Sequence, residues 1–206
     1  MIIECGPLHD RRTLTITLPE VKKVGVFVSG GIDSALLYYL LVLENQKTDN
    51  QHNIRPIVIH RKEGSKYHAR PVVDQINTVL KISSVPVRLG NTTLSELEQV
   101  KHAVIQAFAL PPYFEAVYVG VITNRPEHTI GFDPVIVEHH EQVFMPFKDL
   151  EKCHIIDIYY QLGISDLLKH THSCDQHETI PCGTCNGCRE RIWGFDQLNQ
   201  VDPLNT

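Results

Sequence analysis

Six consecutive residues carry groups that suit phosphate chemistry. The string is Ser29-Gly30-Gly31-Ile32-Asp33-Ser34, and it directly follows an apolar, β-branched run at residues 24–28. Two glycines allow a tight turn and let backbone N–H groups approach an anion closely. The serine hydroxyls can donate to phosphate oxygens, and the Asp33 carboxylate can hold Mg²⁺ or cap a helix. The string therefore predicts a nucleotide phosphate site, with a plain helix-capping turn as the alternative.

Two other phosphate-binding patterns are absent from this loop. A kinase or GTPase loop of the form Gly-x-x-x-x-Gly-Lys-Ser/Thr needs a lysine that this string lacks. The dinucleotide pattern Gly-x-Gly-x-x-Gly is missing as well. The loop therefore predicts a different way of handling nucleotide phosphates.

A cluster of cysteines forms the second candidate for chemistry. Two cysteines stand alone, at Cys5 and Cys153, and the other four crowd within fifteen residues, at Cys174, Cys182, Cys185 and Cys188. Such clustering in a cytosolic chain points to metal rather than to disulfides. Four thiolates match a closed structural zinc site, whereas an iron–sulfur cluster and a group of free thiols are the alternatives. Three nearby histidines can replace a ligand: His170, His172 and His177.

Composition places the chain among ordinary globular proteins. Hydrophobic residues make up 42% of the 206 residues and charged residues 21%. The net charge of −5 disfavours general binding to nucleic acid, although residues 61–70 form a locally basic run that is also typical of a solvated loop. No signal peptide or membrane-spanning stretch is visible, so we expect a soluble, cytoplasmic protein with no membrane partner and no stable nucleic-acid partner.

The elements that must position these residues alternate between strand and helix. Apolar patterns predict strands over residues 24–28, 54–60, 85–89, 116–122 and 142–147. They predict helices over residues 33–45, 69–82, 94–109 and 150–162, the last with Asp149 as its N-cap. Alternation of this kind indicates an α/β fold with a parallel sheet and helices on both faces. Because such sheets bind ligands beyond the carboxyl ends of their strands, chemistry is expected after Val28, Ile59 and Ile122.

The phosphate string resembles the Ser-Gly-Gly-x-Asp-Ser loop of the ATP pyrophosphatase superfamily. The C-terminal residues narrow the resemblance to the 7-cyano-7-deazaguanine synthase family. The matching strings are Thr171-His172-Ser173-Cys174, the run from Cys182 to Arg189, then Arg191 and Gly194-Phe195. Met145-Pro146-Phe147 and Lys152 also resemble that family. Lys152 falls in the first turn of a predicted helix, where a cation is disfavoured unless an anion lies close, so it is a candidate phosphate ligand or else an exposed lysine.

The resemblance implies one Rossmann-like domain over residues 1–206, of the adenine nucleotide alpha hydrolase type, with a helical zinc segment at about 165–200. It implies ATP, Mg²⁺ and Zn²⁺ as cofactors, and a ligase that adenylates a deazapurine acid for attack by ammonia, releasing AMP and pyrophosphate. A second copy of the chain is the implied partner. The catalytic candidates are Ser29, Asp33, Ser34 and Lys152. The nucleotide candidates are residues 29–34 with Val58, Ile59 and His60, and the zinc ligands are Cys174, Cys182, Cys185 and Cys188.

The segments expected to hold the acceptor depart from the family pattern. An aromatic-Asp-Tyr-Gly-Gln string is expected after the second strand, where this chain has Ile59-His60-Arg61-Lys62-Glu63-Gly64. Leu89-Gly90-Asn91 replaces another expected loop. Arg61, Phe132 and Asp133 are the predicted acceptor contacts. A tRNA-thiolating enzyme and a non-catalytic nucleotide-binding relative are the alternative functions.

Overall fold

The structure is a computed structural model that describes residues 1–49, 51–59, 65–89, 96–123, 141–177 and 179–205. Its centre is a five-stranded parallel sheet of order β5-β4-β3-β6-β7. The strands are β3 (Lys23–Phe27), β4 (Asn53–Ile59), β5 (Val87–Leu89), β6 (Ala116–Tyr118) and β7 (Val143–Phe144). All five lie within or beside the predicted strand segments, so the predicted α/β class with a parallel sheet is confirmed.

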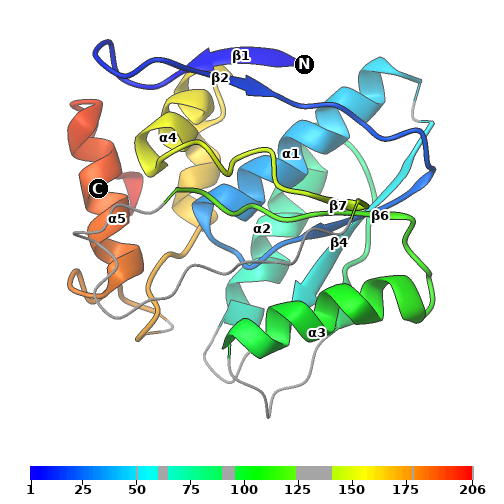
Figure 1. Cartoon of the computed structure of the whole chain (residues 1–206). Helices are drawn as coiled ribbons and strands as arrows, with labels where there is room; N and C mark the ends of the chain where they lie inside the picture. The colour runs from blue at the N-terminus through cyan, green and yellow to red at the C-terminus, as the bar shows by residue number, and fades with distance from the viewer. Residues whose placement is uncertain (50, 60–64, 90–95, 124–140, 178, 206) are drawn as a thin grey trace.

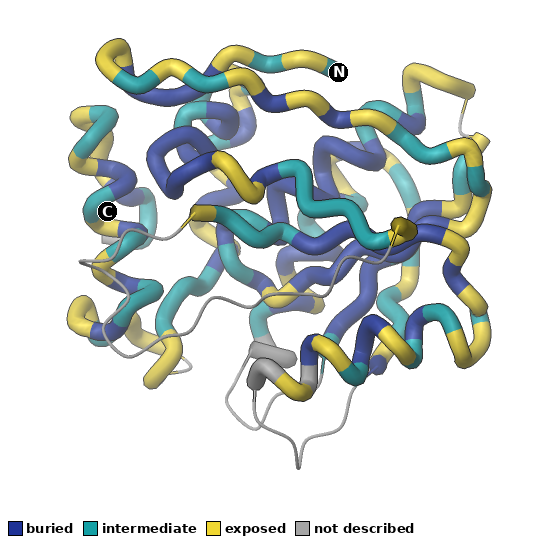
Figure 2. Tube along the Cα trace, in the orientation of Figure 1, coloured by how far each residue is buried: buried dark blue, intermediate teal, exposed yellow. Residues whose placement is uncertain are grey.

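Helices cover both faces of this sheet (Figure 1). The helices are α1 (Ile32–Lys47), α2 (Ser65–Leu80), α3 (Glu96–Ala109), α4 (Lys152–Gln161) and α5 (Asn186–Gln197), the last of which packs against α4. The 3-10 turns are η2 (Ser165–His170) and η3 (Pro203–Asn205). One apolar core joins the sheet to α1, α2 and α4, and a second core joins its other face to α3. The buried parts of the chain run along the sheet and α1, as Figure 2 shows.

The order of the strands explains where a ligand can enter. From β3 the chain moves outward through β4 to β5, and it then returns to the other side of β3 to form β6 and β7. The direction therefore reverses between β3 and β6, which is where open parallel sheets form a crevice at their carboxyl ends. The loop at residues 29–34 and Gly120 follow these two strands, so the phosphate string lies at the switch point.

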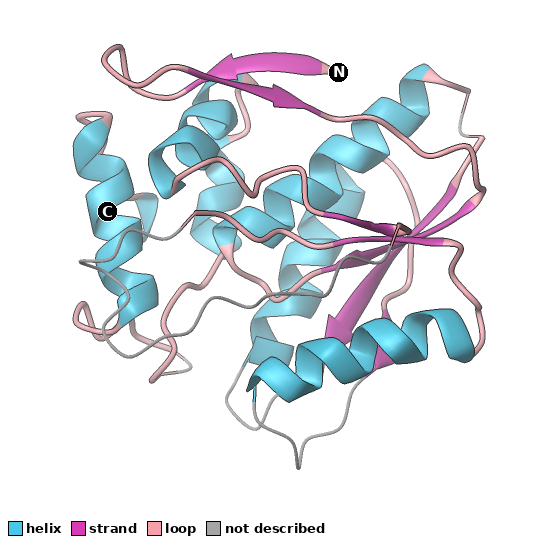
Figure 3. Ribbon diagram, viewed as in Figure 1, coloured by secondary structure: helices cyan, strands magenta, loops and turns pink. Residues whose placement is uncertain are grey.

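Two features of the fold differ from the predictions. The structure contains an antiparallel hairpin of β1 (Ile2–Cys5) and β2 (Arg12–Thr15), which Figure 3 shows beside α4 and which was not predicted. The predicted N-cap of the fourth helix was wrong: Glu151, not Asp149, is the N-cap of α4. Glu151 accepts the backbone N–H of His154, and the His154 ring accepts that of Glu151, so this reciprocal pair fixes the start of α4 two residues later than expected.

None of the helices in the described part of the chain is long and apolar enough to cross a membrane.

Candidate nucleotide and metal sites

The loop between β3 and α1 has the shape that an anion site requires. The helix N-cap is Gly31, and no side chain caps it, so the free N–H groups of the first turn face the loop. The hydroxyls of Ser29 and Ser34 lie 3.0 Å apart, and Ser34 Oγ also accepts the Ser29 N–H at 3.1 Å. These bonds hold both hydroxyl groups beside the start of α1, and Asp33 does not supply the N-cap that the alternative interpretation needed.

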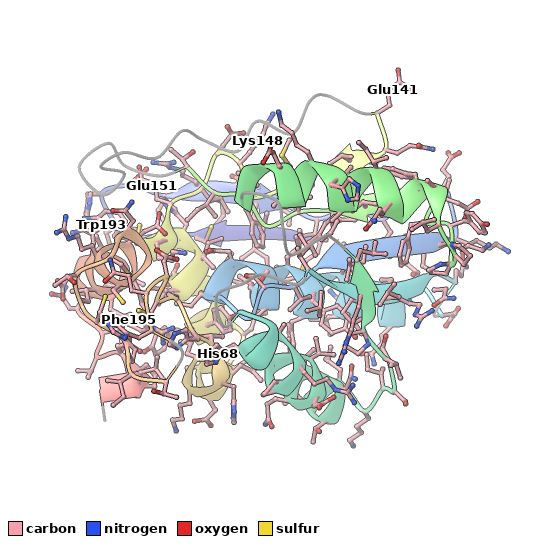
Figure 4. All side chains as sticks on the ribbon, turned by 90° about the horizontal axis from the view of Figure 1, so that it is seen from below. His68, Glu141, Lys148, Glu151, Trp193 and Phe195 are labelled. Atoms are coloured by element: carbon pink, nitrogen blue, oxygen red, sulfur yellow. The ribbon has the colours of Figure 1, made fainter. Side chains whose placement is uncertain are left out.

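A glycine is required at position 30 for two reasons: its backbone conformation and the lack of space for a side chain. Its φ is +92°, and an added Cβ would lie 2.7 Å from the backbone of His68 and Ala69 at the start of α2. The backbone carbonyl of Gly30 accepts the N–H of His172 at 2.9 Å. The His172 ring stacks on His68, with ring centroids 3.9 Å apart. Figure 4 shows His68 at the start of α2. The cysteine-bearing segment and α2 therefore both contact the phosphate loop.

Lys152 reaches the loop from the first turn of α4. Its Nζ donates to Asp33 Oδ2 at 2.5 Å and lies 3.1 Å from Glu190 Oε2 of α5. The Lys152 side chain is only 4% exposed. Burial opposes its charge, but the two carboxylates outweigh that effect and raise the pKa of Lys152 above its ordinary value. Lys152 is therefore a buried, charged group aimed at the loop and not an exposed lysine.

The charges around Lys152 leave room for a further cation. One ammonium faces two carboxylates, which leaves an excess of one negative charge in a largely buried place. The second oxygen of Asp33, Oδ1, is buried and has no hydrogen-bond partner among the described residues. A buried carboxylate oxygen needs a partner, and carboxylates are favoured ligands of Mg²⁺. The residues present therefore fit a magnesium ion that arrives with a nucleotide.

An apolar pocket of about 160 Å³ opens beside the loop. Ser29 and Ser34 lie at its polar end, and Gly120 closes against the start of α1, where an added Cβ would lie 3.2 Å from Ser34 Cα. Its remaining lining comes from β3, β4, α3 and the segment after β6: Phe27, Val28, Ile57, Ile59, Val100, Val119 and Val121. Apolar walls with hydroxyls at one end suit a flat heterocycle joined to a charged chain.

Two of the predicted nucleotide contacts on β4 lie on opposite faces of the sheet. Ile59 lines it, whereas Val58 packs on the opposite face of the sheet in the core with α1 and α2. Ile32 is fully buried, and its backbone carbonyl accepts the hydroxyl of Tyr159 at 2.8 Å. His60 and the predicted acceptor contacts lie outside the described residues, namely Arg61, Phe132 and Asp133.

The four clustered cysteines meet at one point. Their sulfur atoms all lie within 4.8 Å of one another, in the set Cys174, Cys182, Cys185 and Cys188. Two of the separations are 3.9 Å and 4.0 Å. A tetrahedral zinc with bonds of about 2.3 Å would separate its sulfurs by about 3.8 Å. The set therefore fits one four-coordinate metal ion, and the geometry is consistent with zinc.

The surroundings of the clustered cysteines shift their pKa values in opposite directions. Bonds from Thr184 and from the Cys185 N–H lower the pKa of Cys182 to about 5. Burial raises the pKa of Cys185 and of Cys188. Two buried thiols that resist ionisation need a cation to be held as thiolates, which a bound metal would supply. Among the described residues, no histidine nitrogen belongs to this group of four sulfur atoms, and His172 Nε2 instead lies 2.6 Å from the carbonyl oxygen of His177.

The residues that follow the cysteines fasten this segment to the rest of the fold. The guanidinium of Arg191 is buried, bonds both carboxylate oxygens of Asp202, and donates to Thr171 Oγ1 at 2.9 Å. Gly194 lets α5 lie close against α4, since a Cβ there would come within 2.8 Å of Ile156. Figure 4 shows Glu151, Trp193 and Phe195 at this same end of the molecule. The Arg and Gly of the C-terminal motif therefore hold the cysteine segment in place.

The switch-point loop, the adjoining apolar pocket and the Lys152–Asp33 pair together define an α/β protein with a candidate nucleotide site. Comparison with known proteins narrows that class. A family model described as "Queuosine biosynthesis protein QueC" matches residues 124–199. The 7-cyano-7-deazaguanine synthase of Sulfurovum sp. (strain NBC37-1) is 26% identical over 89% of this chain and 97% of its own length.

A second curated relative points to the same family, and one solved structure has a similar fold. The 7-cyano-7-deazaguanine synthase of Aliarcobacter butzleri (strain RM4018) is 26% identical over 90% of this chain and 96% of its own length. The structure of NMN synthetase from Francisella tularensis superposes with a TM-score of 0.54 at 14% identity, covering 88% of this chain and 79% of that one, and shows the fold alone. The predicted resemblance to the 7-cyano-7-deazaguanine synthase family is therefore confirmed, and the chain is a distant relative of these ATP-dependent ligases.

Proposed function

We propose that this protein is an ATP-dependent carbon–nitrogen ligase that makes a nitrile from a 7-carboxy-7-deazaguanine-like acid and ammonia. The observation that carries the proposal is the contact between Lys152 and Asp33, residues 119 positions apart, at the phosphate loop. A loop that merely turned the chain would not need a buried ammonium held against it. The distant relation to 7-cyano-7-deazaguanine synthases supplies the class of acceptor.

The first step of the proposed reaction joins the acid to AMP. A carboxylate oxygen of the acceptor attacks the α-phosphorus of ATP, the bond from that phosphorus to the α,β-bridging oxygen breaks, and pyrophosphate leaves with the electron pair. Ammonia then attacks the acyl carbon, AMP leaves, and the nitrogen loses a proton to give the amide. A second ATP activates the amide oxygen in the same way, and loss of AMP and protons yields the nitrile.

The described residues have distinct parts in this scheme. The Ser29 and Ser34 hydroxyls and the N–H groups of the first turn of α1 bind the phosphates, and the apolar pocket takes the adenine. Lys152 places positive charge where negative charge develops on the departing pyrophosphate. Asp33 would hold Mg²⁺, which neutralises phosphate charge when bound. The cysteine cluster, with its four positions taken by thiolates, would bind zinc in a structural role.

A thiolating enzyme is the weaker candidate. Such chemistry needs an accessible, ionisable cysteine outside the metal cluster, and the two available, Cys5 and Cys153, are 0% and 1% exposed. Burial and the carboxylate of Asp157 also raise the pKa of Cys5 to about 12. Neither thiol suits a sulfur carrier in this conformation.

The proposed function is tested by the products. Purified protein is incubated with Mg-ATP, ammonia and candidate 7-deazaguanine acids, and nucleotides and acceptor are followed by mass spectrometry. The proposal expects AMP, pyrophosphate and a nitrile. ADP as the stoichiometric product would refute ATP cleavage at the α-phosphate. In a parallel incubation with tRNA and a sulfur donor, sulfur incorporation would assign the thiolating alternative. A protein that binds Mg-ATP but consumes none with any acceptor would be a non-catalytic relative.

A further inference from the structure

Glu190 links the cysteine segment to the nucleotide site. It lies in α5, two residues beyond Cys188, and its side chain is 14% exposed. Its Oε2 is 3.1 Å from Lys152 Nζ, and the only other anionic partner of that ammonium among the described residues is Asp33. Neither the phosphate string nor the cysteine spacing pointed to this carboxylate.

Lys152 depends on such a partner because its position is unfavourable for a cation. It is the first residue of α4, where the helix dipole presents positive charge. Its side chain is also almost completely buried, so water cannot solvate the ammonium. Helix α5 meets this side chain twice, since Glu190 holds the ammonium and an added Cβ at Gly194 would lie 2.9 Å from Lys152 Cγ. Helix α5 therefore holds both the aliphatic part and the ammonium group of the Lys152 side chain.

We propose that Glu190 is a positioning residue that holds Lys152 at the phosphates during cleavage of ATP. This inference rests on the proposed function, because it assigns Lys152 to the departing pyrophosphate. An ammonium has three N–H donors. When Asp33 engages the magnesium ion, Glu190 keeps one donor fixed and charged, and a donor remains for a phosphate oxygen. The cysteine cluster then acts on catalysis through α5, without touching the nucleotide.

The test compares Glu190→Gln with Asp196→Asn, which removes an exposed carboxylate from the same helix. Gln keeps the size and an oxygen acceptor but loses the charge. A charge-assisted hydrogen bond is worth about 1.5–3 kcal/mol, which corresponds to roughly a 10- to 100-fold effect. We expect kcat for AMP formation to fall by about that factor in E190Q, with KM for ATP changed less than about 3-fold and metal content unchanged. D196N should match the wild type, and Glu190→Asp, which keeps the charge, should retain more activity than E190Q.

Three results of the kinetic and metal measurements would overturn the proposal. They are wild-type kcat in E190Q, an equal loss in the Asp and Gln variants, and a loss that follows the metal content rather than the charge. Crystal structures with Mg²⁺ and a non-hydrolysable ATP analogue give a readout that is independent of turnover. Lys152 Nζ should lie within hydrogen-bond distance of a phosphate oxygen in the wild type and move away in E190Q. An unmoved Nζ contradicts the positioning role, whereas a wild-type protein that binds no nucleotide refutes the proposed function itself.

Discussion

Asp33 combines two roles at the scale of a single residue. One oxygen accepts from the Lys152 ammonium, while the other is buried without a hydrogen-bond partner among the described residues. Asp33→Asn leaves Lys152 paired with Glu190 alone, one charge of each sign, so the folded protein should tolerate the change. We expect AMP formation to fall by at least about 100-fold and the unfolding temperature to change little. Steady-state kinetics and thermal unfolding measure both quantities.

The matched control removes an exposed acid elsewhere. Asp74→Asn breaks the exposed pair between Asp74 and Arg70 on α2, and it should leave kinetics unchanged. If Asp33→Asn instead destabilises the protein and spares turnover, Asp33 stabilises the fold and does not serve the phosphates.

The sequence was sufficient for some residues of the site and insufficient for others. Residues 29–34 are contiguous, so their types alone indicated a phosphate loop. The spacing of the four clustered cysteines alone indicated a metal site. Lys152 was singled out through its place in a helix, but its pairing with Asp33 depends on tertiary packing. Glu190 gave no signal, because a glutamate on a helix is ordinarily solvated and only the approach of α5 to α4 at Gly194 buries it.

At the scale of elements, the phosphate loop offers a matched pair of glycines. Gly30 has a φ of +92° and would place a Cβ 2.7 Å from the start of α2, whereas at Gly31 the nearest atom to a new Cβ is 3.4 Å away and φ is −79°. Gly30→Ala should therefore lower the free energy of unfolding by about 1–3 kcal/mol and weaken Mg-ATP binding. Gly31→Ala should cost little stability. Denaturant unfolding without nucleotide separates the two, and equal losses would show that the loop is not held as described.

The hairpin β1–β2 is joined to α4 through His154. Its Nε2 donates to the Asp10 carbonyl at 2.9 Å and its Nδ1 accepts the Glu151 N–H at 3.2 Å, which requires the neutral ring. Burial, aided by the charge of Arg12, lowers the pKa of His154 below 6.5. The unfolded chain therefore takes up a proton first as the pH falls below about 6.5, and the free energy of unfolding declines towards pH 5.

This decline predicts the behaviour of two histidine variants. In His154→Gln the free energy of unfolding should depend less steeply on pH between 7 and 5, although its value at pH 7 should be lower. His9→Gln, at an exposed position of the same hairpin, should keep the wild-type slope. Denaturant titrations at each pH supply the values. A slope unchanged in His154→Gln would assign the pH dependence to other groups.

The hairpin also shows what periodicity could and could not reveal. Residues 13–18 alternate polar and apolar side chains, a pattern typical of a half-buried strand, and Leu14 and Ile16 are indeed 1% exposed. That signal was available and was missed. The N-cap of α4 could not be predicted in the same way, because an aspartate is the more usual N-cap. The reciprocal bonds of Glu151 with His154 are visible only in the folded backbone.

At the scale of the whole molecule, two distant parts of the chain build one site. β3 and α1 supply the phosphate loop, and the last fifth of the chain supplies Glu190 and the N–H that binds the Gly30 carbonyl. This arrangement makes the C-terminal cysteine segment part of the support of the nucleotide site. If the protein acts as proposed, catalysis should depend on a metal that does not contact the substrate.

Removal of the metal tests that dependence. Helix α5 begins between Cys185 and Cys188, so a chelator that strips the ion should release the buried thiols and loosen the helix. A loss of about 3 kcal/mol would lower the unfolding midpoint by roughly 6–12 °C in a chain of this size. AMP formation should fall in parallel, because Lys152 loses Glu190, and the far-ultraviolet circular dichroism should report less helix. Elemental analysis should find one zinc per chain, and Cys5→Ser should keep both metal and activity. Iron with acid-labile sulfide would replace the zinc assignment, and full activity in a metal-free protein would break the link between this segment and the site.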